Sequence, residues 1–259
     1  MSNATVIYNE HVGGPFFRMA LRWKGRGFRP GQFVMVRVSG ALDPLLRRPF
    51  GIYDVLGGRK GIEILYKVVG RGTGMLSELD PGDRVDVLGP LGNGFPMVRD
   101  PESLVMVAGG IGVAPFFWLA KGIAGKGRRP VLLYGARTKE EVRLVRPFRA
   151  AGVRVRVTTE DGSVGSRGLV TDLLDRELVE GRTVYACGPL GMLMAVSEAA
   201  RRRGVKCLVS LERAMACGIG VCLGCAVKTR PHPQEQKHYS MVCSDGPVFA
   251  SEEIDWDSF

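Results

Sequence analysis

The spacing of apolar and polar residues divides the chain into three regions, of which the first covers residues 1–98. This region contains short β-rich runs separated by glycine, proline or aspartate, which is typical of strands joined by tight turns. The runs cover residues 6–8, 33–38, 51–55, 62–69 and 84–88. Their spacing predicts a small antiparallel β-barrel.

In residues 99–208 the apolar runs alternate between strand length and helix length. Strands are expected at 104–108, 131–134, 153–158 and 183–186, and helices at 116–123, 140–150, 169–178 and 192–203. Such alternation predicts a parallel, doubly wound α/β sheet, in which ligands bind beyond the carboxyl ends of the strands.

Two turns in this second region fall at that predicted edge of the sheet. One contains Gly109, Gly110 and Gly112, and Pro115 stands where the G-x-G-x-x-G pattern would have its last glycine. Proline suits the first turn of a helix, where its missing N–H costs nothing. The other turn is Cys187-Gly188-Pro189. Both are candidates for binding a nucleotide, although glycine-rich turns also serve packing alone.

The third region, residues 209–259, is organised by four of the six cysteines. Cys217, Cys222 and Cys225 form C-x4-C-x2-C, and Cys243 follows after seventeen residues. This spacing is the plant-type arrangement for a 2Fe-2S cluster, and the interspersed glycines allow a tight wrap. Zinc is the competing metal, but structural zinc usually draws on two paired knuckles. A disulfide framework suits small secreted chains better than a chain of this length.

Two places in the first region are candidates for binding an anion or a cofactor. Residues 47–52 form a rigid turn that enters a strand beside cationic side chains. Residues 70–74 carry three glycines and Thr73, and would expose backbone donors at the start of a helix. Either segment could also be an ordinary turn.

The composition and charge of the chain argue against several classes of function. The 259 residues are 45% hydrophobic, enough for a sizeable core. The net charge of +10 is scattered in small groups, so we predict no nucleic-acid binding. Residues 104–120 lack charge, but glycines and Pro115 interrupt them, so we expect no membrane span and a cytoplasmic protein. No triad or paired-carboxylate pattern predicts a catalytic side chain.

Together these motifs resemble the ferredoxin-reductase superfamily. The matching segments are Arg48-Pro49-Phe50-Gly51, residues 109–115 and Cys187-Gly188-Pro189, and the resemblance covers nearly the whole chain. More narrowly, LLRRPF, VDVLGPLGNGF, VCSDGPVF and the cysteine pattern are similar to electron-transfer subunits of dihydroorotate dehydrogenase B. The fold implied is multi-domain α+β: a flavin barrel (1–98), a nucleotide domain (99–208) and a small iron–sulfur β subdomain (209–259).

The resemblance also implies which residues hold cofactors. Those for FAD would be Arg48, Pro49, Phe50, Gly51, Leu65, Tyr66, Lys67, Gly72 and Thr73. NAD would bind at Gly109, Gly110, Gly112, Cys187, Gly188 and Pro189, and the cluster at Cys217, Cys222, Cys225 and Cys243. Gly51 stands where the family usually has serine, whose hydroxyl would reach the flavin's redox-active edge.

The implied activity is a relay between two chains. Dihydroorotate is oxidised on FMN in a separate catalytic subunit, and electrons pass through the 2Fe-2S cluster and FAD to NAD⁺, in a complex with two copies of each chain. One alternative is the small subunit of an NADH-dependent ferredoxin:NADP oxidoreductase, which Arg137 supports as a 2′-phosphate ligand. In that relative an aspartate replaces the first cluster cysteine, so Cys217 argues against it. A second alternative is a non-catalytic zinc module on the same fold.

Overall fold

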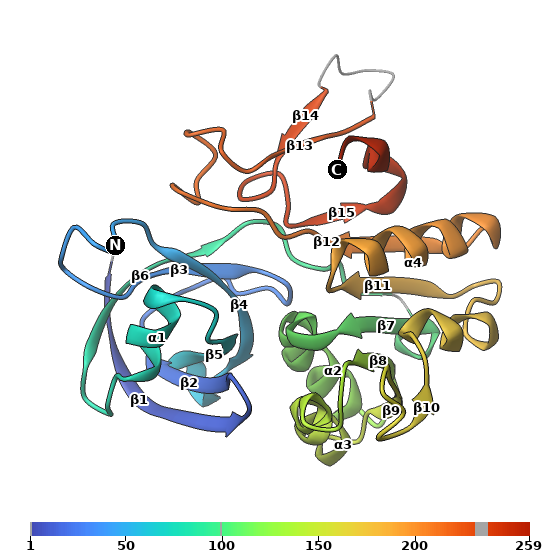
Figure 1. The fold of residues 1–259 in the computed structure, drawn as a ribbon, viewed down its shortest axis with the longest axis horizontal. Helices are drawn as coiled ribbons and strands as arrows, with labels where there is room; N and C mark the ends of the chain where they lie inside the picture. Colours follow the sequence, from blue (N-terminus) through green and yellow to red (C-terminus); the bar gives the residue numbers. More distant parts are fainter. Residues whose placement is uncertain (1, 99, 231–237) are drawn as a thin grey trace.

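The structure, a computed structural model, describes residues 2–98, 100–230 and 238–259. It contains a closed β-barrel, a mainly parallel sheet flanked by helices, and a C-terminal part that lies across both (Figure 1). This arrangement confirms the predicted fold class. In the described ranges, no helix is long and apolar enough to cross a membrane.

The barrel is built from the first six strands. They pair in the order β1-β2-β5-β4-β3-β6, and every pairing between neighbours is antiparallel. Their bounds are β1 Ser2–Gly13, β2 Phe16–Arg22, β3 Phe33–Arg37, β4 Arg48–Val55, β5 Gly61–Lys67 and β6 Arg84–Leu91, with helix α1 Arg71–Ser77 between the last two. Strand β2 falls outside the runs predicted from the sequence.

Alternation of side chains along each strand fills the barrel interior. Val34 and Val36 on β3, and Ile62 and Ile64 on β5, are fully buried in one core. Leu76 of α1 packs into the same core, so this short helix covers one end of the barrel. The core fixes the positions of the strands that carry Arg48, Gly51 and Lys67.

The second sheet has strand order β10-β9-β8-β7-β11-β12-β15, and its first six strands run parallel. The strands are β7 Leu104–Gly109, β8 Val131–Ala136, β9 Arg154–Thr159, β10 Ser166–Arg167, β11 Thr183–Cys187 and β12 Lys206–Ser210, and the helices are α2 Phe117–Ala124, α3 Arg146–Ala150 and α4 Leu190–Arg202. The uncharged stretch 104–120 is therefore a buried strand, a turn and the start of a helix.

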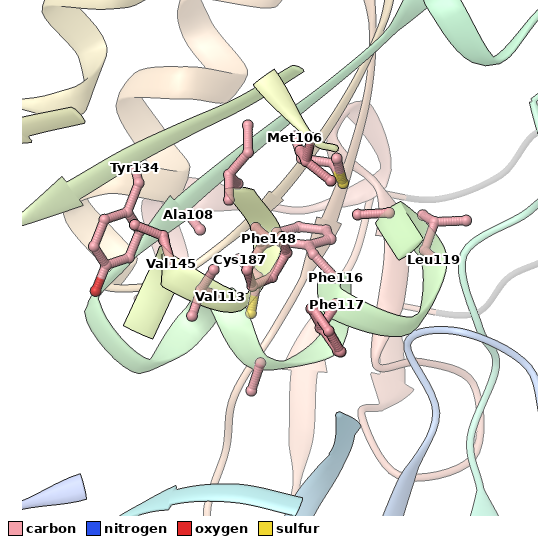
Figure 2. Close-up of a cluster of buried hydrophobic side chains, with 14 of the residues drawn as sticks. Met106, Ala108, Val113, Phe116, Phe117, Leu119, Tyr134, Val145, Phe148 and Cys187 are labelled. Carbon is pink, nitrogen blue, oxygen red and sulfur yellow. The ribbon is translucent and has the colours of Figure 1, made fainter. Parts of the chain in front are cut away.

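Helices cover both faces of this sheet, as a doubly wound fold requires. On one face Met106 and Tyr134 pack against Phe116, Phe117 and Phe148 from the helical side (Figure 2). The opposite face packs against α4 and a 3-10 segment over 170–176. The helix predicted at 169–178 is this 3-10 segment. The one predicted at 140–150 is a 3-10 turn at 141–145 followed by α3, because Pro147 removes a backbone donor.

The C-terminal part leaves the second sheet after β12 and returns to it at β15. It contains the hairpin β13 Ala226–Lys228 and β14 Tyr239–Met241, and then β15 Val248–Ala250. Strand β15 pairs antiparallel with β12, with Ser210 opposite Val248. The described residues between these two positions, 211–230 and 238–247, lie above the barrel and the sheet in Figure 1. They contain all four cysteines of the predicted cluster.

Stacked aromatic rings join the barrel to the second sheet. Tyr53 of β4 stacks on Phe117 of α2, with ring centroids 4.4 Å apart and planes within 7°. Phe95 stacks on Tyr185 of β11 at 4.7 Å. These buried contacts hold the two parts in a fixed relation, so cavities between them are features of the fold.

Candidate cofactor sites

Two cavities open between the barrel and the parallel sheet, and they meet. The larger is about 730 Å³ and the smaller about 570 Å³. Five residues line both: Lys67, Ile111, Leu211, Glu212 and Arg213. Two ligands seated in these cavities would therefore touch the same short segments of the protein.

The smaller cavity collects the residues predicted to hold FAD. Its lining includes Arg48, Pro49, Phe50, Gly51, Leu65, Tyr66, Lys67 and Thr73. The Phe50 and Tyr66 rings meet edge to face at 5.7 Å, and the Tyr66 hydroxyl donates to Asn9 Oδ1 at 2.9 Å. Burial raises the pKa of Tyr66 to about 12, so its phenol stays neutral. The result is a rigid, mostly apolar wall that fits a planar ring.

The turn at the start of α1 has a closely packed arrangement. Thr73 Oγ1 accepts from the Val69 and Gly70 N–H groups at 2.9 and 3.2 Å, and donates to the Gly70 carbonyl. Gly72 is outside the cavity lining, but a Cβ there would lie 2.5 Å from Arg48 Nε. The hydrogen bonds of the Thr73 hydroxyl are therefore made within the turn. The Arg48 side chain packs against the turn at Gly72 and brings a positive charge to the cavity.

Gly51 leaves open space where the family usually has serine. A Cβ at position 51 would lie 3.8 Å from Pro115 Cβ, an ordinary contact distance. The protein thus has room for a Cβ at this position, so contact with neighbouring residues does not by itself require glycine here.

The larger cavity is lined by both predicted nucleotide-binding turns. Gly109, Gly110 and Gly112 contribute from one turn, and Gly188 and Pro189 from the other. A Cβ on Gly112 would lie 2.4 Å from the carbonyl oxygen of Cys187, so the two turns are in direct contact. Cys187 itself lines the smaller cavity instead, and burial raises the pKa of its thiol.

Arg137, a candidate ligand for a 2′-phosphate, is already paired in this cavity. Its Nε and Nη2 donate to Glu141 Oε1 at 3.3 and 3.2 Å, and its backbone N–H donates to Oε2 at 3.0 Å. Glu141 and Glu160 both line the cavity. A ligand with an extra phosphate would therefore face two carboxylates and an arginine whose charge is already balanced.

This pairing predicts that the protein binds NADH more tightly than NADPH. In Glu141→Gln the Arg137 guanidinium loses its counter-charge, so NADPH affinity should rise by roughly tenfold, equivalent to about 1.4 kcal/mol. Dissociation constants for both nucleotides provide the measurement. Glu140→Gln, at the exposed neighbouring position, is the matched control. Equal wild-type affinity for NADH and NADPH would contradict the prediction.

The four cysteines of the C-terminal part are drawn together by a tight loop. Gly218 and Gly220 have φ of +75° and +84°, and Leu223 has φ of +57°, so three residues adopt the left-handed conformation. That conformation is strained for leucine, and such strain is found mainly at functional sites. The Ile219 N–H donates to Cys217 Sγ at 3.4 Å and the Gly220 N–H to Cys243 Sγ at 3.1 Å. Donors aimed at sulfur favour the thiolate form that binds metal.

The thiols interact in two pairs. Cys217 contacts Cys222, and Cys243 contacts Cys225, with a further electrostatic interaction between Cys217 and Cys243. The Ile219 N–H, ahead of other causes, lowers the pKa of Cys217 to about 6. Two pairs fit a 2Fe-2S cluster, in which each iron takes two protein ligands.

The loop is buried on one side and exposed on the other. Cys225 and Cys243 are 2% exposed, whereas Cys222 faces solvent. Around Cys222, the side chains of Ile219, Val221 and Leu223 are 51%, 74% and 64% exposed. Met215, which precedes the loop, packs against the core and lines the smaller cavity.

The sequence missed several residues that line the cavities. Phe16 enters the larger one from the barrel, and Glu212, Arg213 and Phe259 enter from the C-terminal part. No local pattern marks these positions, because only the packing of distant segments brings them together. The segment 211–215 lines one or both cavities and leads directly to Cys217, so it joins the cavities to the cysteine loop.

Three family models match successive parts of the chain. Residues 14–95 match the oxidoreductase FAD-binding domain, and residues 106–198 the oxidoreductase NAD-binding domain. Residues 212–255 match the iron–sulfur cluster binding domain of dihydroorotate dehydrogenase B.

Among curated proteins, the chain is 42% identical to a dihydroorotate dehydrogenase B (NAD(+)) electron transfer subunit from Caldanaerobacter subterraneus subsp. tengcongensis, over 97% of each chain. It is 43% identical to the subunit of the same name from Geobacillus thermodenitrificans, over 87% of this chain and 86% of that one.

Among solved structures, one of the NADH-dependent reduced ferredoxin-NADP oxidoreductase matches with a TM-score of 0.84 and 30% identity, over 99% of this chain and 91% of that one. A ferredoxin NADP⁺ reductase from Neisseria gonorrhoeae matches with a TM-score of 0.66 and 18% identity, over 83% and 92% of the two chains, and shares the fold.

Proposed function

The chain belongs to the electron transfer subunits of dihydroorotate dehydrogenase B, and from this membership we propose that it carries electrons from a dihydroorotate-oxidising subunit to NAD⁺. It is an oxidoreductase subunit with FAD-binding, NAD-binding and iron–sulfur-binding domains. The other reductase considered, the ferredoxin:NADP enzyme, is less favoured because its identity is 30% against 42%. The reaction contributes to pyrimidine biosynthesis.

One observation carries the proposal. The segment 211–215 borders both cavities and continues into the loop of paired cysteines, so three candidate cofactor sites share one stretch of backbone. When bound, the cluster supplies single-electron transfer and the flavin links it to the hydride chemistry of NAD⁺. The protein's own part is to hold these groups close to one another and to keep them in fixed orientations.

The residues that would hold each group follow from the lining of the sites. The apolar wall of Phe50, Leu65 and Tyr66 supports binding of a flavin ring in the smaller cavity, and Arg48 supports binding of its phosphates. The glycine turns at 109–112 and 188–189 let a dinucleotide approach the backbone in the larger cavity. Cys217, Cys222, Cys225 and Cys243 would hold the cluster through their thiolates.

We propose further that the partner is an FMN-containing catalytic subunit, that the complex holds two copies of each chain, and that it works in the cytoplasm. A reducing compartment suits a protein whose Cys187 and Cys207 are unpaired and buried. The exposed rim of Ile219, Val221 and Leu223 beside Cys222 supports a docking surface there, because apolar side chains clustered at an electron entry point suit coverage by a partner.

The direct test is to purify the chain together with its catalytic partner. The complex should show flavin and iron–sulfur absorbance and reduce NAD⁺ when dihydroorotate is added. A protein that binds zinc and no flavin would contradict the proposal. Light scattering on the purified complex measures the copy number independently.

Val221→Glu tests the docking surface. Placing a charge on a side chain that is 74% exposed leaves the fold intact but opposes burial under a partner. Dihydroorotate-dependent NAD⁺ reduction should fall at least ~10-fold, the size expected for an interface hot spot. Oxidation of NADH with an artificial acceptor should be unchanged. Val179→Glu, at an exposed valine outside the loop, is the control. Full activity in an intact Val221→Glu complex would move the interface elsewhere.

A further inference from the structure

The cations around the larger cavity differ in whether their charge is balanced. Arg137 is paired with Glu141. Lys67 and Arg213 also line the cavity, and in residues 2–98, 100–230 and 238–259 no carboxylate oxygen lies within ion-pair distance of either one. Two unbalanced cations facing one cavity are suited to an anionic ligand.

The guanidinium group of Arg213 packs on an aromatic ring. Its guanidinium carbon lies 4.3 Å from the centre of the Phe259 ring, within the range of a cation–π contact. The ring is itself supported, because Phe259 stacks on Trp256 at 5.9 Å and Trp256 Nε1 donates to the Ser251 carbonyl at 3.0 Å. A guanidinium that rests on a ring by its face keeps the N–H donors on its edge available.

The backbone that carries Arg213 is also fixed. The Leu211 N–H donates to the Pro247 carbonyl at 2.9 Å, immediately after β12. Arg213 lines both cavities, but Phe259 lines the larger one only. The ring therefore holds the guanidinium on the side of the larger cavity.

The carboxylate of Glu212 does not balance the charge of Arg213. Glu212 is exposed to the cavities but enclosed by protein on either side, and this enclosure alone raises the pKa of its carboxyl. Lys67 lies over the Phe16 ring at 5.7 Å, so the barrel presents a second cation seated on an aromatic ring to the same cavity.

We propose that Arg213, positioned by Phe259, binds the diphosphate of a nucleotide in the larger cavity, and that Lys67 assists from the barrel. This inference rests on the proposed function, which seats the pyridine dinucleotide in that cavity. Guanidinium groups bind phosphate oxygens through paired N–H donors, which gives both charge and orientation. FAD also carries a diphosphate, and Arg213 borders its cavity too, so the test must separate the two sources.

The test measures equilibrium binding to the protein loaded with FAD and cluster. ADP-ribose has the diphosphate without the nicotinamide, and adenosine lacks both. Arg213→Gln should weaken ADP-ribose binding about 10-fold or more and leave adenosine binding unchanged. Arg213→Lys should recover part of the loss. Phe259→Leu keeps apolar bulk but removes the aromatic face, and should weaken ADP-ribose binding about 3-fold. Arg26→Gln, an exposed barrel arginine outside both cavities, is the control.

Each result bears on the assignment. Wild-type affinity for ADP-ribose in Arg213→Gln overturns it. Loss of FAD with unchanged ADP-ribose binding also overturns it and assigns Arg213 to the flavin diphosphate. Weaker binding of adenosine and ADP-ribose alike overturns it in favour of a structural role. If the wild type, loaded with FAD and cluster, binds no ADP-ribose, the proposed function fails and the inference fails with it.

Discussion

Cys222→Ser is expected to remove the iron–sulfur cluster, to leave FAD bound, and to abolish transfer from dihydroorotate to NAD⁺. Cys222 faces solvent, so the substitution leaves the core unchanged. It removes one thiolate from a Cys217–Cys222 pair, and the hydroxyl that replaces it is not a ligand of choice for iron–sulfur clusters. The rate should fall by more than ~100-fold, because changes beside a metal ligand already cost about 10–100-fold.

Three measurements separate the sites in this variant: iron content, FAD content, and oxidation of NADH by an artificial acceptor. Only the iron should be lost, because the residues predicted to hold FAD lie on strands β4 and β5 and at the start of α1, and none of the four cysteines of the loop lines the smaller cavity. Cys207→Ser is the matched control, since Cys207 is a buried cysteine beside Ser197 and Ser251, outside the cluster loop. Loss of FAD from Cys222→Ser with a folded barrel would show that the two sites depend on one another.

Gly112→Ala should give the second large effect, on nucleotide binding. The added Cβ would lie 2.4 Å from the carbonyl oxygen of Cys187, 2.6 Å from its carbon and 2.7 Å from Gly188 Cα. All three are backbone atoms, which no side-chain rotation can move away, so the two candidate nucleotide-binding turns must separate. We expect NADH affinity to fall ~100-fold, the scale of a misplacement of about 1 Å, and stability to fall by about 1–3 kcal/mol from overpacking.

The control for Gly112→Ala is Gly122→Ala. Gly122 lies in α2, and a Cβ added there would meet no neighbouring segment within 4 Å, so alanine should stabilise the helix by up to about 1 kcal/mol. NADH titration and thermal unfolding of the two variants give the comparison. Unchanged NADH affinity in Gly112→Ala would mean that the contact between the turns does not shape the cavity.

Local patterns predicted the parts of the fold that depend on local chemistry. The spacing of Cys217, Cys222 and Cys225 predicted a cluster loop, and the glycines at 218 and 220 take the left-handed conformation that such a loop needs. The left-handed residue before Gly224 was not predictable, because Leu223 disfavours that conformation and adopts it only when the whole loop closes.

The prediction of secondary structure was weaker where the same spacing of apolar residues fits two kinds of element. Val170, Leu173 and Leu174 are buried at helical spacing, yet the segment is a 3-10 helix, whose buried positions recur at nearly the same interval. Strand β2 was missed because its run FFRMALR is apolar on both faces near its end, without strict alternation. Arg213 and Phe259 lie far apart along the chain and meet only through the pairing of β12 with β15.

The pairing of β12 with β15 shows how the cysteine-containing segment is connected to the sheet. Ser210 and Val248 are opposite each other on neighbouring antiparallel strands, a relation that a short hairpin turn could satisfy. The residues between them, which include the four cysteines, thus connect two neighbouring strands, and both ends of this connection lie at the same edge of the sheet. The segment proposed to hold the cluster therefore lies between two neighbouring strands of one sheet. Because the docking surface is proposed on this segment, we expect its exchange to change the electron donor while the strand order of the sheet stays the same.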